Sequence, residues 1–126
     1  MATKAKEEGN AAFRRKDYAE AVQCFTRSLT LNSRDYQVLG NRSAALSSLG
    51  RWEESLADAR AAVAIDPTYV KGFYRQANAL LQLGRPAEAA AAATAGLKLQ
   101  PSNAQMQELL HRATAQMGQM DDDEEE

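Results

Sequence analysis

The sequence predicts an all-α fold, a solenoid of stacked helical hairpins, and three observations support this prediction. Similar residues recur every 34 positions along the chain. Each copy of this repeat holds two segments whose apolar residues follow helical spacing. No segment shows the alternation of apolar and polar residues that marks a half-buried strand. Because a single pair of helices cannot bury its own apolar faces, the copies are expected to stack on one another.

The 34-residue period is visible at several sets of equivalent positions. Three copies fit the chain, over residues 2–35, 36–69 and 70–103. The positions that match at this step are Tyr18, Trp52 and Pro86; Glu20, Glu54 and Glu88; and Leu31, Ile65 and Leu99. Equivalent residues should therefore take equivalent places in their own hairpins.

Each copy carries marks of where its helices begin and end. In the first copy, Asp17 is expected to cap the helix "YAEAVQCFTRSL" by accepting hydrogen bonds from its free N–H groups. In the second copy, "YQVLGNRSAALSSLG" should end at Gly50, and the helix that starts at Trp52 should end before Pro67. In the third copy, Pro86 falls in the first helical turn, where its missing N–H costs nothing.

Small residues recur where the two helices of a hairpin would cross. Two antiparallel helices joined by a tight turn approach closely only if small side chains lie at the crossing. The residues that meet this need are Gly9, Ala21, Ser28, Ser43, Ser55, Ala62, Ala77, Ala89 and Gly96. All nine are expected to lie at the crossings of their hairpins.

The third repeat needs a cover for its outer apolar face, and the next segment provides one. Residues 103–118 form an amphipathic pattern after an N-cap at Ser102 or Asn103, so a seventh, capping helix is predicted there. The repeat domain is thus expected over residues 2–118. Residues 119–126, which end in six acids, are expected to form a disordered acidic tail, because a block of like charges cannot bury itself.

Composition and charge narrow the classes of function. A chain of 126 residues with one cysteine is large enough for one core, and it excludes a disulfide framework and a cysteine-based metal site. No apolar run is long enough to span a membrane, and the N-terminus lacks the apolar core of a signal peptide, so a cytoplasmic or nuclear location is expected. Residues 1–120 hold 15 Lys and Arg against 11 acids, a modest formal charge of +4 without interleaved aromatic residues. Nucleic-acid binding is therefore not expected.

The chain resembles the tetratricopeptide repeat family from residue 2 to about residue 118. The resemblance rests on the 34-residue period, the segment "GNAAF" in the first helix, the aromatic-x-x-Ala start of the second helix and the closing proline. It implies a right-handed superhelical solenoid whose first helices line the concave face. The segments "KEEGN", "NRSAA" and "KGFYR" further resemble the carboxylate clamp of co-chaperones such as the Hsp-organising protein. Such domains bind the C-terminal Glu-Glu-Val-Asp of heat-shock chaperones.

Matching these motifs residue by residue gives a clamp of Lys6, Asn10, Asn41, Lys71 and Arg75. The spacing of the residues supports this grouping independently. Lys6 and Asn10 lie one helical turn apart, as do Lys71 and Arg75, and Asn41 stands 34 residues before Arg75. The result is a slot with cationic walls and an amide floor. By the resemblance, Lys6 and the two asparagines would hold a main-chain carboxylate, while the other two cations would hold the terminal acid's side chain.

Three further residues are expected beside this clamp. Phe13 and Ala45 are predicted to shape a small apolar pocket for the penultimate side chain of the peptide. Asn78 is also placed among the peptide-binding residues, and it leaves open which class of chaperone is preferred.

The leading functional hypothesis is an adaptor that captures the C-terminal peptides of heat-shock chaperones. The alternative is a self-assembling scaffold in which the acidic tail occupies the clamp of the same or another copy. An enzyme is not expected, since the sequence holds no clustered nucleophile and base, no phosphate-binding glycine loop and no metal-ligand spacing. No cofactor, metal, membrane or nucleic-acid partner is predicted.

Overall fold

The computed structural model describes residues 2–125 of the chain, and the side chains of residues 3–119. Residues 2–125 fold into seven α-helices and contain no strand, which confirms the predicted all-α class. The helices are α1 (Ala2–Arg14), α2 (Tyr18–Leu31), α3 (Tyr36–Ser48), α4 (Trp52–Ile65), α5 (Val70–Gln82), α6 (Pro86–Leu99) and α7 (Ala104–Glu125).

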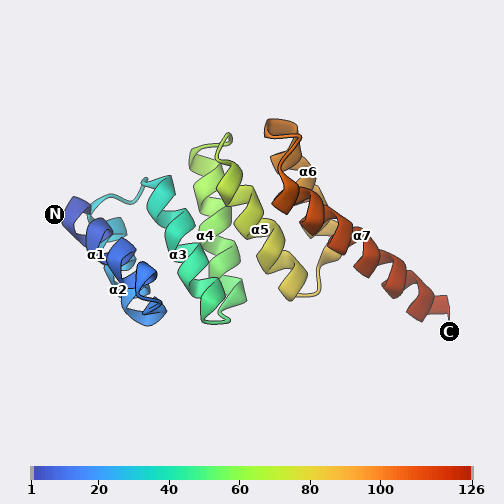
Figure 1. Cartoon of the computed structure of the whole chain (residues 1–126), viewed down its shortest axis with the longest axis horizontal. Helices are drawn as coiled ribbons and strands as arrows, with labels where there is room; N and C mark the ends of the chain where they lie inside the picture. The colour runs from blue at the N-terminus through green and yellow to red at the C-terminus, as the bar shows by residue number, and fades with distance from the viewer. Residues whose placement is uncertain (1, 126) are drawn as a thin grey trace.

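The helices stack in chain order, so the two ends of the chain lie at opposite ends of the molecule (Figure 1). Within each repeat the two helices pack against each other. In addition, α4 contacts α5, and α6 contacts α7. The backbone of α3 contacts those of α1 and α5, and α5 contacts α7. In the described residues, α2 makes no such contact with α4, nor α4 with α6. The odd-numbered helices are thus closer together and form the inner face of the solenoid.

Local capping explains where several helices begin. The Asp17 side chain accepts a hydrogen bond from the Glu20 N–H at 3.3 Å, and Asn103 Oδ1 accepts one from the Met106 N–H at 3.0 Å. Pro86 occupies the first turn of α6. These three features confirm the predicted starts of α2, α6 and α7.

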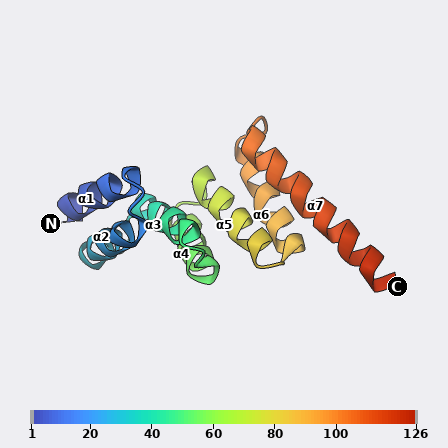
Figure 2. The ribbon, with the colours of Figure 1, turned by 60° about the horizontal axis from the view of Figure 1, so that its bottom comes forward.

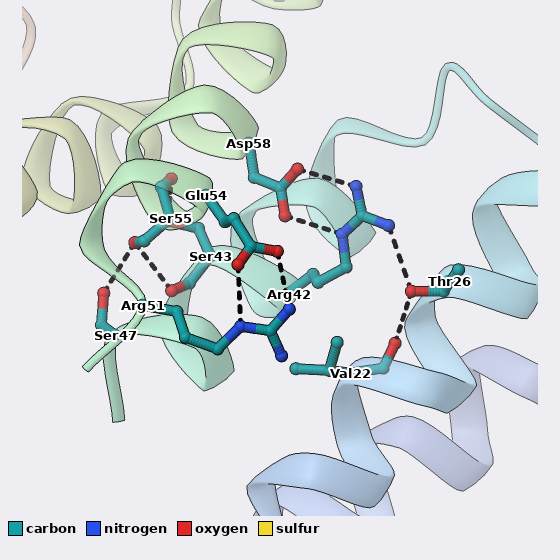
Figure 3. A network of polar contacts seen from close by, with 9 residues as sticks. All are labelled: Val22, Thr26, Arg42, Ser43, Ser47, Arg51, Glu54, Ser55 and Asp58. Atoms are coloured by element: carbon teal, nitrogen blue, oxygen red, sulfur yellow. Dashed lines mark hydrogen bonds and ion pairs between the residues drawn. The ribbon is translucent and has the colours of Figure 1, made fainter. Parts of the chain in front are cut away.

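The nine small residues expected at the hairpin crossings are all buried. In the middle repeat the crossing is polar, because Ser43 of α3 meets Ser55 of α4 (Figure 3). Each hydroxyl oxygen lies within hydrogen-bonding distance of the other hydroxyl, at 2.8 Å, and of the other residue's carbonyl oxygen, at 2.8 and 2.9 Å, and each donates its single hydrogen to one of them. Ser47 adds a third hydroxyl, 2.7 Å from that of Ser55. Both residues at the crossing are fully buried, and their polar groups are satisfied by each other.

A charged pair joins α3 to α4 (Figure 3). The Arg42 guanidinium donates from two nitrogens to the two carboxylate oxygens of Asp58, each at 2.7 Å. It also donates to the Thr26 hydroxyl of α2 at 3.2 Å. The hydrogen bonds to Asp58 raise the pKa of Arg42. One arginine therefore ties three helices together.

The end of the chain differs from the sequence-based expectation. The capping helix was predicted to stop at residue 118, with a disordered tail over 119–126, yet α7 continues to Glu125. No proline or β-branched residue interrupts the chain after Gly118, so each added residue can continue the i to i−4 hydrogen bonds. Figures 1 and 2 show these last turns leading away from the rest of the molecule. Glu126 lies outside the described residues.

Candidate carboxylate-binding groove

Two adjoining clefts lie on the inner face of the solenoid. The main cleft has a volume of about 530 Å³, and the small cleft about 170 Å³. Residues of the main cleft are Lys6, Asn10, Tyr36, Gln37, Asn41, Asp66, Thr68, Tyr69, Val70, Lys71 and Gln100. Residues of the small cleft are Asn10, Phe13, Arg14, Asn41, Ala44 and Arg75. Because Asn10 and Asn41 line both clefts, we treat the two as one groove.

The two asparagines meet at the centre of this groove. Asn41 of α3 donates a hydrogen bond from its side-chain nitrogen to the side-chain oxygen of Asn10 of α1, at 3.2 Å. Both residues are half-buried. This contact leaves the side-chain N–H₂ of Asn10 and one N–H of Asn41 as donors for a ligand.

Lys6 lies one turn before Asn10 and forms the α1 wall of the main cleft. Its Nζ atom donates to the Gln37 side-chain oxygen at 3.3 Å and lies 3.6 Å from Asp35 Oδ2. The first wall of the groove is therefore a lysine that already has polar contacts within the protein.

The opposite wall comes from α5 and carries two cations. Lys71 is exposed at the main cleft, and Arg75 is half-buried at the small cleft. Among the side chains that the structure describes, neither cation forms an ion pair. The guanidinium of Arg75 lies 5.3 Å from the centre of the Tyr74 ring, and its burial lowers its pKa. A cation removed from water without an anion is unfavourable, and a bound carboxylate would relieve this cost.

The five residues predicted as a clamp thus surround one groove, from three different helices. Phe13 also lines the small cleft. The other two predicted residues are placed differently. Ala45 is fully buried in the core with Phe25 and Val38 and does not reach the groove. Successive residues of a helix point about 100° apart, so its neighbour Ala44 lines the small cleft instead.

Asn78, the last predicted site residue, is half-buried on α5 and lines neither cleft. It lies three residues beyond Arg75, toward the C-terminal end of α5. The placement of Asn78 therefore does not support its inclusion among the groove residues.

Several groove residues were missed by reasoning from the sequence. Tyr36 and Tyr69 form an edge-to-face pair at the main cleft, with ring centres 5.0 Å apart. Tyr69 precedes α5 and lies over Gly40, where a Cβ atom would collide with its hydroxyl and ring, and its ring also lies close to Gly72. These tyrosines could have been found only by noticing that both stand at a helix start that faces the groove. Arg14, the last residue of α1, adds a further cation at the small cleft.

In the described part of the chain, no group of three or more His, Cys, Asp or Glu residues is arranged to hold a metal ion. Nor does any helix in residues 2–125 combine the length and apolar character needed to cross a membrane.

Comparison with known proteins identifies the repeats. Models of the tetratricopeptide repeat match residues 6–70 and residues 70–103. The chain belongs to the tetratricopeptide repeat family. The predicted resemblance and the solenoid of paired helices are thereby confirmed. The described residues also hold the seventh helix expected to follow the third tetratricopeptide repeat.

Curated relatives of this tetratricopeptide repeat chain include co-chaperone proteins. The chain is 44% identical over 112 residues to the protein STIP1 homolog of Dictyostelium discoideum, which covers 89% of this chain and 20% of the relative. It is 44% identical over 103 residues to the Hsp70-Hsp90 organizing protein of Triticum aestivum, covering 82% of this chain and 18% of the relative. The chain therefore spans about one fifth of the length of these relatives.

Solved structures with the same fold include tetratricopeptide domains that hold peptides. The first such domain of Spaghetti (RPAP3), bound to an HSP90 peptide ending in EEVD, superposes with a TM-score of 0.90 at 26% identity, covering 93% of each chain. The TPR2B domain of yeast Sti1 in complex with an Hsp70 peptide gives a TM-score of 0.85 at 26% identity, covering 91% of this chain and 97% of that one.

Proposed function

We propose that this chain is an adaptor module of the co-chaperone type, which captures the acidic C-terminus of heat-shock chaperones. The observation that supports it most directly is the convergence of Lys6, Asn10, Asn41, Lys71 and Arg75 on one groove. The peptide complexes of similar tetratricopeptide domains add a second line of support. The role is non-catalytic, because the groove offers hydrogen-bond donors and positive charge rather than a nucleophile with a base.

The chemistry of the groove fits a chain that ends in an acidic residue. Such an end presents two carboxylates a few bonds apart, one from the main chain and one from the side chain. Lys6 and the two asparagine amides are placed to bind the first, while Lys71 and Arg75 on the opposite wall bind the second. Charge-assisted hydrogen bonds are worth about 1.5–3 kcal/mol each, so the terminal residue supplies most of the affinity.

The small cleft accounts for the residue before the terminal acid. Phe13 and Ala44 give it an apolar lining beside the two asparagines. Its volume of about 170 Å³ suits a small aliphatic side chain such as valine. A peptide ending in Glu-Glu-Val-Asp would place its valine there, with the acidic side chain beside Arg75.

The test is a calorimetric titration with a peptide ending in Glu-Glu-Val-Asp, carrying either a free or an amidated C-terminus. The free acid should bind, and amidation should weaken binding by about tenfold or more, since it removes a charged acceptor. Lys71→Ala and Arg75→Ala should each weaken binding by a similar factor and leave the helical circular dichroism unchanged.

Lys98→Ala provides the matched control, because Lys98 is an exposed cation of α6 that lies outside both clefts. Its affinity should stay within about twofold of the wild-type value, as expected for a distant surface charge. Equal affinities of the Lys71, Arg75 and wild-type forms for the free-acid peptide would refute the clamp.

Self-assembly through the acidic tail is not favoured as an alternative. The last turns of α7 lead away from the rest of the molecule (Figure 2), which argues against contact between the tail and the groove of the same copy. The expected cytoplasmic location, with the nucleus as the other candidate, remains a prediction that imaging of a tagged chain would test.

A further inference from the structure

Asp35 lies at the start of α3, beside Lys6, which lines the main cleft. Its Oδ1 atom accepts a hydrogen bond from the Val38 N–H at 3.2 Å and so caps α3. Its Oδ2 atom lies 3.6 Å from Lys6 Nζ. The side chains are only 30% exposed for Lys6 and 20% exposed for Asp35, so water screens this pair less than a fully exposed one.

We propose that Asp35 is an internal competitor for Lys6, which a ligand carboxylate must displace before Lys6 can bind it. This inference rests on the proposed function of the groove. When no ligand is bound, the carboxylate of Asp35 is the anion that lies next to Lys6. Because the cap to Val38 anchors the aspartate to α3, the carboxylate stays within reach of the lysine.

The two walls of the groove are therefore unequal. On α5, Lys71 and Arg75 have no carboxylate partner among the described side chains, and they are free to receive an anion. On α1, Lys6 has to exchange one carboxylate for another, so its net contribution to binding is reduced. Asp35 thereby sets the affinity of the groove for acidic chain ends without touching the ligand itself.

The variant Asp35→Asn separates the charge of this residue from its capping role. Asparagine caps helices as well as aspartate does, so its side-chain oxygen can keep the bond to Val38. Without the competing charge, a free-acid peptide ending in Glu-Glu-Val-Asp should bind about threefold more tightly. A partly exposed ion pair is worth less than about a factor of five, which sets the upper limit of the gain.

Asp66→Asn is the matched control, since Asp66 lines the main cleft together with Lys6. Its Oδ1 accepts hydrogen bonds from the Thr68 N–H at 3.0 Å and the Thr68 hydroxyl at 2.7 Å, contacts that an asparagine oxygen can keep. Asp66 makes no ion pair among the described side chains. Its neutralisation removes one negative charge from the main cleft without freeing Lys6, so affinity should rise by less than about 1.5-fold.

A double-mutant cycle with Lys6→Met distinguishes competition from simple repulsion. If Asp35 competes for Lys6, the gain from Asp35→Asn should shrink to the level of the Asp66 control once Lys6 is gone. If Asp35 only repels the ligand, the gain should persist or grow in the Lys6→Met background, and the inference is then wrong. Asp35→Ser, which also keeps a capping oxygen, repeats the test should the asparagine variant fold poorly.

The outcomes also separate this inference from the proposed function. One outcome would be that the wild-type chain binds the free-acid peptide but not the amide, and that Asp35→Asn binds it with unchanged affinity. This outcome overturns the competition but not the proposed function. Failure of the wild-type, Asp35→Asn and Asp35→Ser forms to prefer the free acid over the amide overturns the proposed function and the competition with it. Binding that is detectable only after Asp35 is neutralised supports both.

Discussion

At the scale of single residues, the three turns inside the repeats share one backbone conformation but not one residue. Gly50 and Gly84 each have φ of 73°, and Lys16 at the equivalent place has φ of 64°. This is the left-handed region, which only glycine enters without steric cost. The first turn therefore holds a strained lysine where the other two hold a relaxed glycine.

Lys16→Gly should raise the free energy of unfolding by roughly 0.5–1 kcal/mol. The relief of strain at a left-handed position is about 1–2 kcal/mol, and the greater freedom of glycine in the unfolded chain offsets part of it. Chemical denaturation followed by circular dichroism measures the change. Lys16→Ala is the control, because alanine keeps the Cβ atom and with it the strain; a glycine variant no more stable than the alanine variant would contradict the explanation.

At the scale of helices, equivalent positions of the repeats hold side chains of different polarity. In the second repeat, Arg42 of α3 reaches Asp58 of α4 with two hydrogen bonds. In the third repeat the residues 34 positions later are Gln76 and Ala92. Ala92 offers no side-chain donor, and the Gln76 side-chain oxygen is buried without a hydrogen-bond partner. The second repeat thus has a hydrogen-bonded pair where the third repeat has a buried oxygen without a partner.

Replacing Gln76 with methionine should stabilise the protein by about 1 kcal/mol. Methionine has nearly the same length and flexibility, and it removes a buried acceptor whose desolvation costs about 1–3 kcal/mol. Thermal and denaturant unfolding would show the gain. Gln23→Met on the exposed face of α2 is the matched control and should change stability by less than about 0.5 kcal/mol. A loss of stability in the Gln76 variant would show that its side chain makes a needed polar contact.

At the scale of the whole molecule, the sequence predicts the solenoid because each repeat forms the same pair of helices and stacks on its neighbour. A fixed period forces equivalent packing at each step, so small residues, caps and the closing helix could all be placed from their spacing. The groove could be predicted less completely. Ala45 was placed there instead of Ala44, because the direction of a side chain depends on the rotation of α3 against its neighbours. Tyr36 and Tyr69 were missed because helix starts reach the groove only through the superhelical stacking.

The covering role of α7 leads to the last prediction. Met106 and Ala113 of this helix are fully buried and Leu109 is nearly so, and the Met106 thioether lies over Gly96 of α6. In a solenoid the terminal repeat depends on such a cover, since nothing else shields its apolar face.

Met106→Ala should therefore lower the free energy of unfolding by about 2–4 kcal/mol, the usual cost of emptying a core position. Glu108→Ala, on the exposed face of the same helix, should change it by less than about 0.5 kcal/mol. A chain ending at Gly118 should keep the wild-type stability, because the turns beyond it lead away from the body (Figure 1). Denaturant unfolding of the three proteins tests the argument together. A stable alanine variant at Met106 would mean that the third repeat holds without its cover, and a large loss on shortening would mean that the last turns of α7 also pack on it.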